Sequence, residues 1–533
     1  MSLAFAALQV TVTGTVLYED RDYGPAGFTG TTTPRPIRRA ELDIVRTSDG
    51  ALLGSGLTDG AGMFSVGGIP ASTSVRARVH ARRNGGKINA SVLDNASSNA
   101  VYAGLSPAID TGTTTAFGVV LFTIAGGAAP AFNLFDCAVK SFEVQALLDP
   151  DLPDSPPLLR IFWQAGSSNG TYYSPVLKAV FLLGLASDPD EYDDDIVLHE
   201  IGHWILDVFS RDDTLGGPHS VTQQLDPRTS WSEGWAHYWS SAVRRQFPAW
   251  YLAPHTQVDN FGSGFSVFDL EAPSFPAQAI MATNELAVAA VLWDITDSSN
   301  EAAFDFLSGN EIEVWTAVDD QMDPAPHLTL EDFRAGIGIV APALLPWVTG
   351  SEAALRIMNA REIRYFPDGS EPNGPADPAP VLNPGPAGLL RRTIFGAGDE
   401  DWYSVDVPVG MLLTAETLNL GDGGNTLLEL YAADRATLLA SNDDRSAGDP
   451  SSLLQHVLSA PGPHFLRVRR SGDVVEHGYY DLRAQASLFV PPPPPEKREA
   501  GYCPVGSAAT SGVPGAWILA GVLLVGAALR RKP

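Results

Sequence analysis

Two histidines and a glutamate stand at the spacing of a metal site in residues 198–204, which read L-H-E-I-G-H-W. On a helix, residues four apart lie one above the other, so His199 and His203 can present two imidazole nitrogens to one Zn²⁺. Glu200 follows the first histidine and can reach a water on the open side of the metal. The alternative is a buried helix whose histidines bond to backbone groups or water.

The residues around this motif predict the helix that would carry it. Three aspartates, Asp193–Asp195, supply an N-cap and negative charge at the positive end of the helix dipole. An apolar face at helical spacing follows, made of Ile196, Val197, Ile201, Ile205 and Val208.

A zinc hydrolase needs a third protein ligand and an open fourth position. Leu206 and Phe209 occupy the positions where a metzincin carries glycine and histidine, which excludes that pattern. Residues 231–239, W-S-E-G-W-A-H-Y-W, offer Glu233 thirty residues after His203. We therefore predict Glu233 as the third ligand.

Three motifs in order carry a family resemblance: H-E-x-G-H, then S-E-G-W-A, then N-E-L-A-V-A-A-V-L-W-D at residues 284–294. Together they resemble the gluzincin metallopeptidases, in particular the fungalysin-like group. The resemblance implies an α+β zincin-like core over residues 131–366 that binds one Zn²⁺ through His199, His203 and Glu233. It also implies a protein or peptide substrate, with Glu200 as the general base.

The chain departs from that group at the residue that would stabilise the oxyanion. Residues 280–283, I-M-A-T, lack the histidine that precedes the L-W helix in fungalysin-like enzymes. The remaining candidates are Tyr172, Tyr173, His219, Tyr251 and His255. We favour His219, in the turn-forming stretch G-G-P-H-S between the two ligand motifs, over its interpretation as a solvated loop histidine.

A second departure is His237, at a position where the family carries an aspartate that orients the first zinc histidine. His237 lies on the same helix face as Glu233, so it could hydrogen-bond to that carboxylate or compete as a ligand. Asp207, four residues after His203, is a substitute candidate for the orienting carboxylate. Its alternative is a solvated aspartate on the helix surface.

The length, net charge and cysteine content of the chain restrict the classes of protein to which it can belong. A chain of 533 residues predicts three or four domains at about 150 residues each. The 34 Lys and Arg residues against 62 Asp and Glu give a net charge of −28, which argues against nucleic acid as a partner. With two cysteines, Cys137 and Cys503, the chain is not a disulfide scaffold, and Cys137 is predicted to be a core residue.

The N-terminal region is predicted to be β. Residues 8–82 alternate apolar and polar positions, and T-D-G-A-G-M-F at residues 58–64 is a hairpin signal. The region resembles the carboxypeptidase regulatory-like β-sandwich, an accessory domain without catalytic residues. Residues 1–7 are interpreted as a signal-peptide remnant or as part of the first strand, and residues 83–130 as a β-rich connecting segment.

After residue 367 the composition changes to Pro, Asn, Gly and Asp. Residues 371–487 resemble the bacterial pre-peptidase C-terminal domain, a β-sandwich common on secreted peptidases. Asp443 and Asp444 either bind Ca²⁺ or form a solvated turn. Residues 488–502 form a stiff Pro-rich linker.

The last stretch, residues 503–533, combines Cys503, an apolar run over residues 513–529 and a terminal R-R-K cluster. It resembles a myxobacterial-type sorting tail that a processing peptidase cuts near Cys503; the alternative is a plain transmembrane tail anchor. Both place the body of the protein outside the cytoplasm, secreted or at the cell surface.

The predicted fold class is multidomain: a zincin-like metallopeptidase core flanked by two β-sandwiches, with a C-terminal sorting or transmembrane segment. The predicted function is a secreted or cell-surface zinc endopeptidase. The alternative is a surface adhesin or glycan-binding protein whose peptidase core is degenerate.

Overall fold

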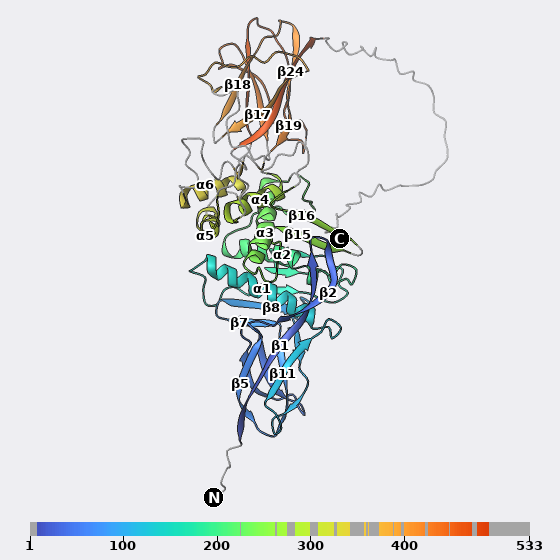
Figure 1. Ribbon diagram of the computed structural model, residues 1–533. Helices are drawn as coiled ribbons and strands as arrows, with labels where there is room; N and C mark the ends of the chain where they lie inside the picture. The colour runs from blue at the N-terminus through green and yellow to red at the C-terminus, as the bar shows by residue number, and fades with distance from the viewer. Residues whose placement is uncertain are drawn as a thin grey trace, which may run out of the picture.

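The computed structural model describes residues 8–223, 225–261, 264–273, 283–298, 307–323, 328–341, 357–358, 361, 373–386, 388–395, 399–421, 425–446, 448–471 and 477–489. The expectations for residues 1–7, for most of the Pro-rich linker and for the tail containing Cys503 lie outside these residues. Figure 1 shows an N-terminal β region, a helical region in the middle and a C-terminal β region at the opposite end.

Two facing sheets form the N-terminal region. In the first, β1 (Gln9–Gly24) pairs in parallel with β11 (Ala116–Phe122) and antiparallel with β2 (Gly27–Pro36) and β5 (Met63–Pro70). The strands of the second are β10 (Ile109–Asp110), β6 (Ser74–His80), β3 (Glu41–Arg46), β4 (Leu52–Leu57) and β9 (Ala103–Leu105). Val12, Ile44 and Val75 from the two sheets belong to one buried hydrophobic cluster.

The predicted turn at residues 58–64 forms, but it does not close a hairpin. Asp59 Oδ1 accepts hydrogen bonds from the backbone N–H groups of Ala61 and Met63, at 2.8 and 2.9 Å. The strands on either side belong to different sheets, because β4 pairs with β3 whereas β5 pairs with β1. The turn therefore carries the chain from one sheet to the other.

The predicted connecting segment, residues 83–130, is divided between two units. Its strands β9, β10 and β11 complete the N-terminal sheets, whereas β7 (Arg82–Gly85) and β8 (Ile88–Leu93) join a separate sheet in the helical region. In that sheet β8 pairs in parallel with β12 (Leu159–Phe162). The other strands are β14 (Ala179–Phe181) and β13 (Tyr172–Ser174). The sheets therefore do not follow a boundary at residue 82.

Four helices build the region beside this sheet: α1 (Ala129–Leu148), α2 (Asp194–Phe209), α3 (Pro227–Arg245) and α4 (Glu285–Thr296). Helix α3 begins at Pro227 after the N-cap Asp226, and Asn284 caps α4 by accepting from Ala287 N at 3.0 Å. A Cβ at Gly202 would lie 3.0 Å from Ala236 Cα, and one at Gly234 would lie 2.5 Å from Val288 Cβ. The motif glycines therefore allow α2, α3 and α4 to pack closely.

Smaller elements complete the helical region. They are the turn η1 (Asp190–Tyr192), the hairpin β15 (Thr256–Phe261) and β16 (Gly264–Asp269), α5 (Glu311–Thr316), the π-helix η3 (Ala317–Met322) and α6 (Leu330–Val340). Cys137 on α1 is buried, as predicted for a core residue.

Two four-stranded sheets form the C-terminal region, with the orders β17-β24-β19-β22 and β18-β23-β20-β21. Their strands are β17 (Leu389–Phe395), β18 (Glu400–Val405), β19 (Met411–Gly421), β20 (Thr426–Tyr431), β21 (Leu438–Asn442), β22 (Leu453–Val457), β23 (His464–Arg470) and β24 (His477–Leu488). Both sheets contribute to one hydrophobic cluster, which gives the predicted sandwich-like arrangement. Asp443 and Asp444 are exposed just after β21. Among the described residues, no helix is long and apolar enough to cross a membrane.

Candidate metal centre

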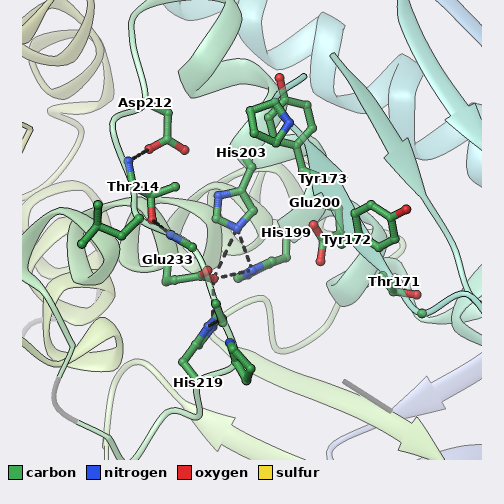
Figure 2. Close-up of a pocket in the computed structure, with 16 residues that line it drawn as sticks. Thr171, Tyr172, Tyr173, His199, Glu200, His203, Asp212, Thr214, His219 and Glu233 are labelled. Atoms are coloured by element: carbon green, nitrogen blue, oxygen red, sulfur yellow. Dashed lines mark hydrogen bonds and ion pairs between the residues drawn. The ribbon is translucent and has the colours of Figure 1, made fainter. Parts of the chain in front are cut away.

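Helices α2 and α3 bring the three predicted ligands together. His199 Nε2 lies 3.2 Å from Glu233 Oε2, and His203 Nε2 lies 3.3 Å from the same oxygen. The two histidine Nε2 atoms lie 3.2 Å apart. Figure 2 shows the three side chains converging at one wall of a cleft.

These separations fit a tetrahedral zinc site. Bonds of about 2.1 Å from a central Zn²⁺ to N or O ligands place neighbouring ligand atoms about 3.4 Å apart. The three observed edges, 3.2, 3.2 and 3.3 Å, are close to that value. A set of two imidazoles and one carboxylate leaves a fourth position open, as in catalytic zinc sites.

A hydroxyl and a carboxylate orient His203. Ser232 Oγ donates to Asp212 Oδ2 at 2.7 Å, and it lies 3.1 Å from His203 Nδ1. Since the only hydroxyl proton goes to Asp212, Ser232 Oγ must accept the second bond from Nδ1–H. With the proton on Nδ1, a neutral His203 presents its Nε2 lone pair to a metal. Thr214 N donates to the other oxygen of Asp212 at 3.0 Å and fixes the carboxylate.

Of the two histidines on α2, His203 is the one whose charged form the cluster favours. Burial lowers the pKa of His199 well below its ordinary value, and the neighbouring His237 adds to the shift. Burial also opposes the charge on His203, but the Glu233 carboxylate outweighs it and raises the pKa of His203 to about 9. The same interaction keeps the pKa of Glu233 low despite burial. Positive charge beside Glu233 is therefore favourable, which suits a site for a divalent cation.

His237 lies behind His199, on the side of the ring opposite the ligand nitrogen. Its Nδ1 lies 3.1 Å from His199 Nδ1 and 2.9 Å from Gln257 Oε1, while its Nε2 lies 3.9 Å from Glu285 Oε1. Of the two expected roles, neither a bond to the Glu233 carboxylate nor competition as a ligand matches these contacts. The imidazole instead contacts His199.

Asp207 does not reach His199 or His203. Its carboxylate accepts from Tyr173 Oη and Lys178 Nζ, both at 2.5 Å. The helical spacing placed Asp207 on the face of His203 but one turn further along, where strand β13 and the loop after it supply its partners. The carboxylate that lies nearest a candidate histidine through one hydroxyl is instead Asp212, which reaches His203 through Ser232.

His219 is held among the ligands rather than in solvent. Its Nδ1 donates to the carbonyl of Gly217 at 3.0 Å, and its Nε2 lies 3.2 Å from Glu233 Oε2 and 3.3 Å from Glu285 Oε2. Burial opposes a charge on His219, yet Glu233 and Glu285 raise its pKa to about 9. The interpretation of His219 as a solvated loop residue therefore does not hold.

The cleft in front of these residues has a volume of about 270 Å³. Glu200, Tyr172 and Tyr173 line it together with His219. The other two oxyanion candidates lie elsewhere: buried Tyr251 bonds to Asp194, and His255 Nδ1 lies 2.8 Å from Asp269 Oδ1.

Three aspartates at the start of α2, the N-cap residue Asp193 and the first-turn residues Asp194 and Asp195, anchor the helix to neighbouring elements. Asp193 occupies the N-cap position without a side-chain cap, because it accepts from Asn260 N of β15 at 2.8 Å. Asp194 accepts from Asn133 Nδ2 of α1 at 2.8 Å. Asp195 receives Val258 N at 2.6 Å and pairs with Arg244 of α3 at 2.7 Å. The start of the metal helix is thus bonded to three neighbouring elements.

Four residues of the centre were not predicted: Asp212, Ser232, Gln257 and Glu285. Ser232 and Glu285 lie within the quoted motifs, so the sequence marked their positions but did not indicate what they contact. Asp212 and Gln257 lie in a loop and on β15, and no local pattern distinguishes them.

Comparisons with known proteins are consistent with a peptidase connection. Residues 154–313 match the model of the mycolysin C-terminal domain, a stretch that includes the metal cluster and ends before the C-terminal sheets. The match covers less than half of the sequence and supports a peptidase-associated protein. An uncharacterized protein from Archaeoglobus fulgidus is 27% identical over 139 residues, which cover 24% of this chain and 37% of that relative.

Two solved structures resemble small parts of the chain. The pre-peptidase C-terminal domain of collagenase from Bacillus anthracis is 16% identical, with 21% of this chain and 100% of that chain covered and a TM-score of 0.18. The lysozyme inhibitor PliG from Aeromonas hydrophila is 20% identical, with the same coverage of 21% and 100% and a TM-score of 0.16. Scores this low carry no argument about the fold.

Proposed function

We propose that the chain is a zinc-dependent endopeptidase that acts on proteins or peptides outside the cytoplasm. The observation that supports this most is the convergence of His199 Nε2, His203 Nε2 and Glu233 Oε2, at 3.2–3.3 Å from one another, beside Glu200 in an open cleft. The mycolysin-type match over the same residues agrees with it.

In this proposal His199, His203 and Glu233 hold the zinc, and Ser232 with Asp212 keeps His203 in the tautomer that binds it. Zinc, when bound, acidifies a coordinated water and polarises the scissile carbonyl. Glu200 accepts a proton from the attacking water and returns it to the nitrogen of the leaving amine.

His219 is the proposed donor to the oxyanion. It lines the cleft beside the ligands, and the carboxylates of Glu233 and Glu285 raise its pKa, which favours the protonated ring with a hydrogen on Nε2. In the present conformation that hydrogen faces Glu233 and Glu285, so a small rotation of the loop side chain would have to accompany substrate binding.

The test is metal content together with turnover of a protein substrate, with and without a chelator. Purified full chain should contain about one zinc at neutral pH, and a chelator should abolish cleavage. Glu200→Gln should keep the zinc and lose nearly all turnover, because it removes a proton acceptor and no ligand. His203→Ala should lose both. Wild-type protein with less than about half a zinc per chain would favour the adhesin or glycan-binding alternative instead.

The proposed location rests on the sequence of the tail. Residues 503–533 would be cut near Cys503 by a sorting peptidase, with the apolar run in the membrane before processing. The mature protein would then be held at the cell surface or released.

A further inference from the structure

A second group of ligand atoms lies next to the first. His219 Nε2, Glu233 Oε2 and Glu285 Oε2 lie within 4.8 Å of one another. His219 comes from the loop between α2 and α3, Glu233 from α3, and Glu285 from the first turn of α4. The carboxylate of Glu233 belongs to both groups, so the two would share one ligand.

The ion pair with His219 does not satisfy the hydrogen-bonding capacity of the Glu285 carboxylate. The residue is 1% exposed, and its Oε2 lies 3.3 Å from His219 Nε2 without the geometry of a hydrogen bond. Two carboxylate oxygens face one ring nitrogen, which carries at most one hydrogen. A buried carboxylate without a full set of partners is costly, so a further positive charge at this point would stabilise the group.

The same atoms have the arrangement of metal ligands. His219 donates its Nδ1–H to the carbonyl of Gly217, which is how metal-bound histidines are commonly oriented, and this directs Nε2 toward the carboxylates. The two edges from His219 Nε2, 3.2 and 3.3 Å, are close to the edge of about 3.4 Å expected around Zn²⁺. The capped start of α4 fixes Glu285, because Asn284 bonds to Ala287 N.

We propose that His219, Glu233 and Glu285 form a second divalent-cation site, which takes zinc at concentrations above those that fill the first. An imidazole with two carboxylates suits Zn²⁺. Paired metal sites lie about 3.5–4 Å apart, a span that one shared carboxylate can bridge. Binding releases the proton of His219 Nε2 to solvent, and the lone pair then faces the ion.

Occupation of this site has a functional consequence, which rests on the proposed function. The second ion engages the nitrogen that donates to the oxyanion, and it draws on the Glu233 oxygen that holds the first zinc. Excess zinc should therefore inhibit cleavage.

The experiment titrates metal-stripped full chain with ZnCl₂ by calorimetry at neutral pH. Wild type should show two sites of different affinity, and Glu285→Gln should keep only the tighter one. The matched control is Glu311→Gln, which removes a carboxylate from α5 that pairs with Arg245 and should leave both sites. In parallel, ¹¹³Cd NMR should give two resonances for wild type and one for Glu285→Gln. Excess zinc should inhibit wild type but not Glu285→Gln, each relative to its own rate at low zinc.

Each other result contradicts the proposal in a distinguishable way. One zinc per wild-type chain would overturn the second site and leave the proposed function intact, whereas no zinc would overturn both. Two zinc ions retained by Glu285→Gln would place the second elsewhere. Loss of both by a variant that circular dichroism shows to be folded would mean that Glu285 supports the first site. If Glu285→Gln does not fold, His219→Gln on the loop replaces it, with the same expectations for calorimetry and ¹¹³Cd NMR and no activity readout, because His219 is the proposed oxyanion donor.

Discussion

The hydrogen-bond chain from Asp212 through Ser232 to His203 should set the zinc affinity. In Ser232→Ala, His203 Nδ1–H loses its acceptor at 3.1 Å and the half-buried Asp212 carboxylate loses its donor at 2.7 Å. Partners of metal-binding histidines typically contribute about 10-fold to 100-fold in affinity, or about 1.4–2.7 kcal/mol. We expect the zinc dissociation constant of Ser232→Ala to rise within that range.

Asp212→Asn tests the tautomer itself, because it keeps the shape of the side chain. Thr214 N–H can only donate, so the amide oxygen of Asn must face it, and the amide NH₂ then faces Ser232. Ser232 would accept from Asn and donate to His203 Nδ1, which stabilises the tautomer with hydrogen on Nε2. To bind zinc, His203 would have to return to the tautomer with hydrogen on Nδ1. The Ser232 hydroxyl would then have no acceptor, at a cost of about 1–3 kcal/mol.

Competition with a chelator of known zinc affinity measures both variants at neutral pH. The matched control is Ser240→Ala on the same helix, whose buried hydroxyl donates to the Asp195 carbonyl at 2.9 Å and contacts no ligand. That variant should lose comparable stability and keep the wild-type affinity. Dissociation constants within about threefold of wild type for both Ser232→Ala and Asp212→Asn would refute the orienting role.

Three further outcomes are expected. Burial raises the pKa of Glu191 from 4.5 to about 7, so the folded state holds the carboxyl proton more tightly and stability falls as the pH rises from about 4.5 to 7. Relative to wild type, Glu191→Gln should raise the free energy of unfolding by up to about 3 kcal/mol at pH 8 but not at pH 4. Equal denaturant curves at pH 8 would contradict this. Arg38→Ala breaks a buried pair with Asp136 and should lower the free energy of unfolding by about 3–5 kcal/mol. The control is Arg39→Ala at the exposed neighbouring residue, which should lower it by under about 1 kcal/mol. Similar losses for the two variants would show that the pair is unimportant. Cys503→Ser should leave the tail uncut in the native host, and mass spectrometry that finds the same mature C-terminus in both proteins would refute processing at this residue.

Local spacing was sufficient to predict the elements of the metal centre. The period of four between His199 and His203 predicted a helix and a shared face, and α2 provides both. These predictions succeed because a helix brings together residues that are near in sequence, so the pattern contains the geometry.

Contacts between distant segments could not be predicted in the same way. The pairing of β8 with β12 joins residues more than sixty positions apart, and the sequence of neither strand indicates which strand it pairs with. The same limit explains why Asp207 was predicted and Asp212 was not considered. Helical spacing correctly placed Asp207 on a face of α2, but the partner of Asp207 depends on which element covers that face. Asp212 reaches Ser232 from a loop, whose sequence has no repeating pattern from which a contact could be predicted.

The relation between the N-terminal sheets and the metal helix follows from such distant contacts. The resemblance implied an accessory domain, yet Tyr23 of β1 donates to Asp195 at 3.0 Å and Arg38 pairs with Asp136 of α1 at 2.7 Å. One hydrophobic cluster runs from Val12 to residues of α2 and α3 without a break. Because Asp195 also pairs with Arg244 of α3, the sandwich bonds directly to the residue that joins the two ligand helices. Its loss would leave buried polar groups of the metal region unpaired, so the two regions should unfold together.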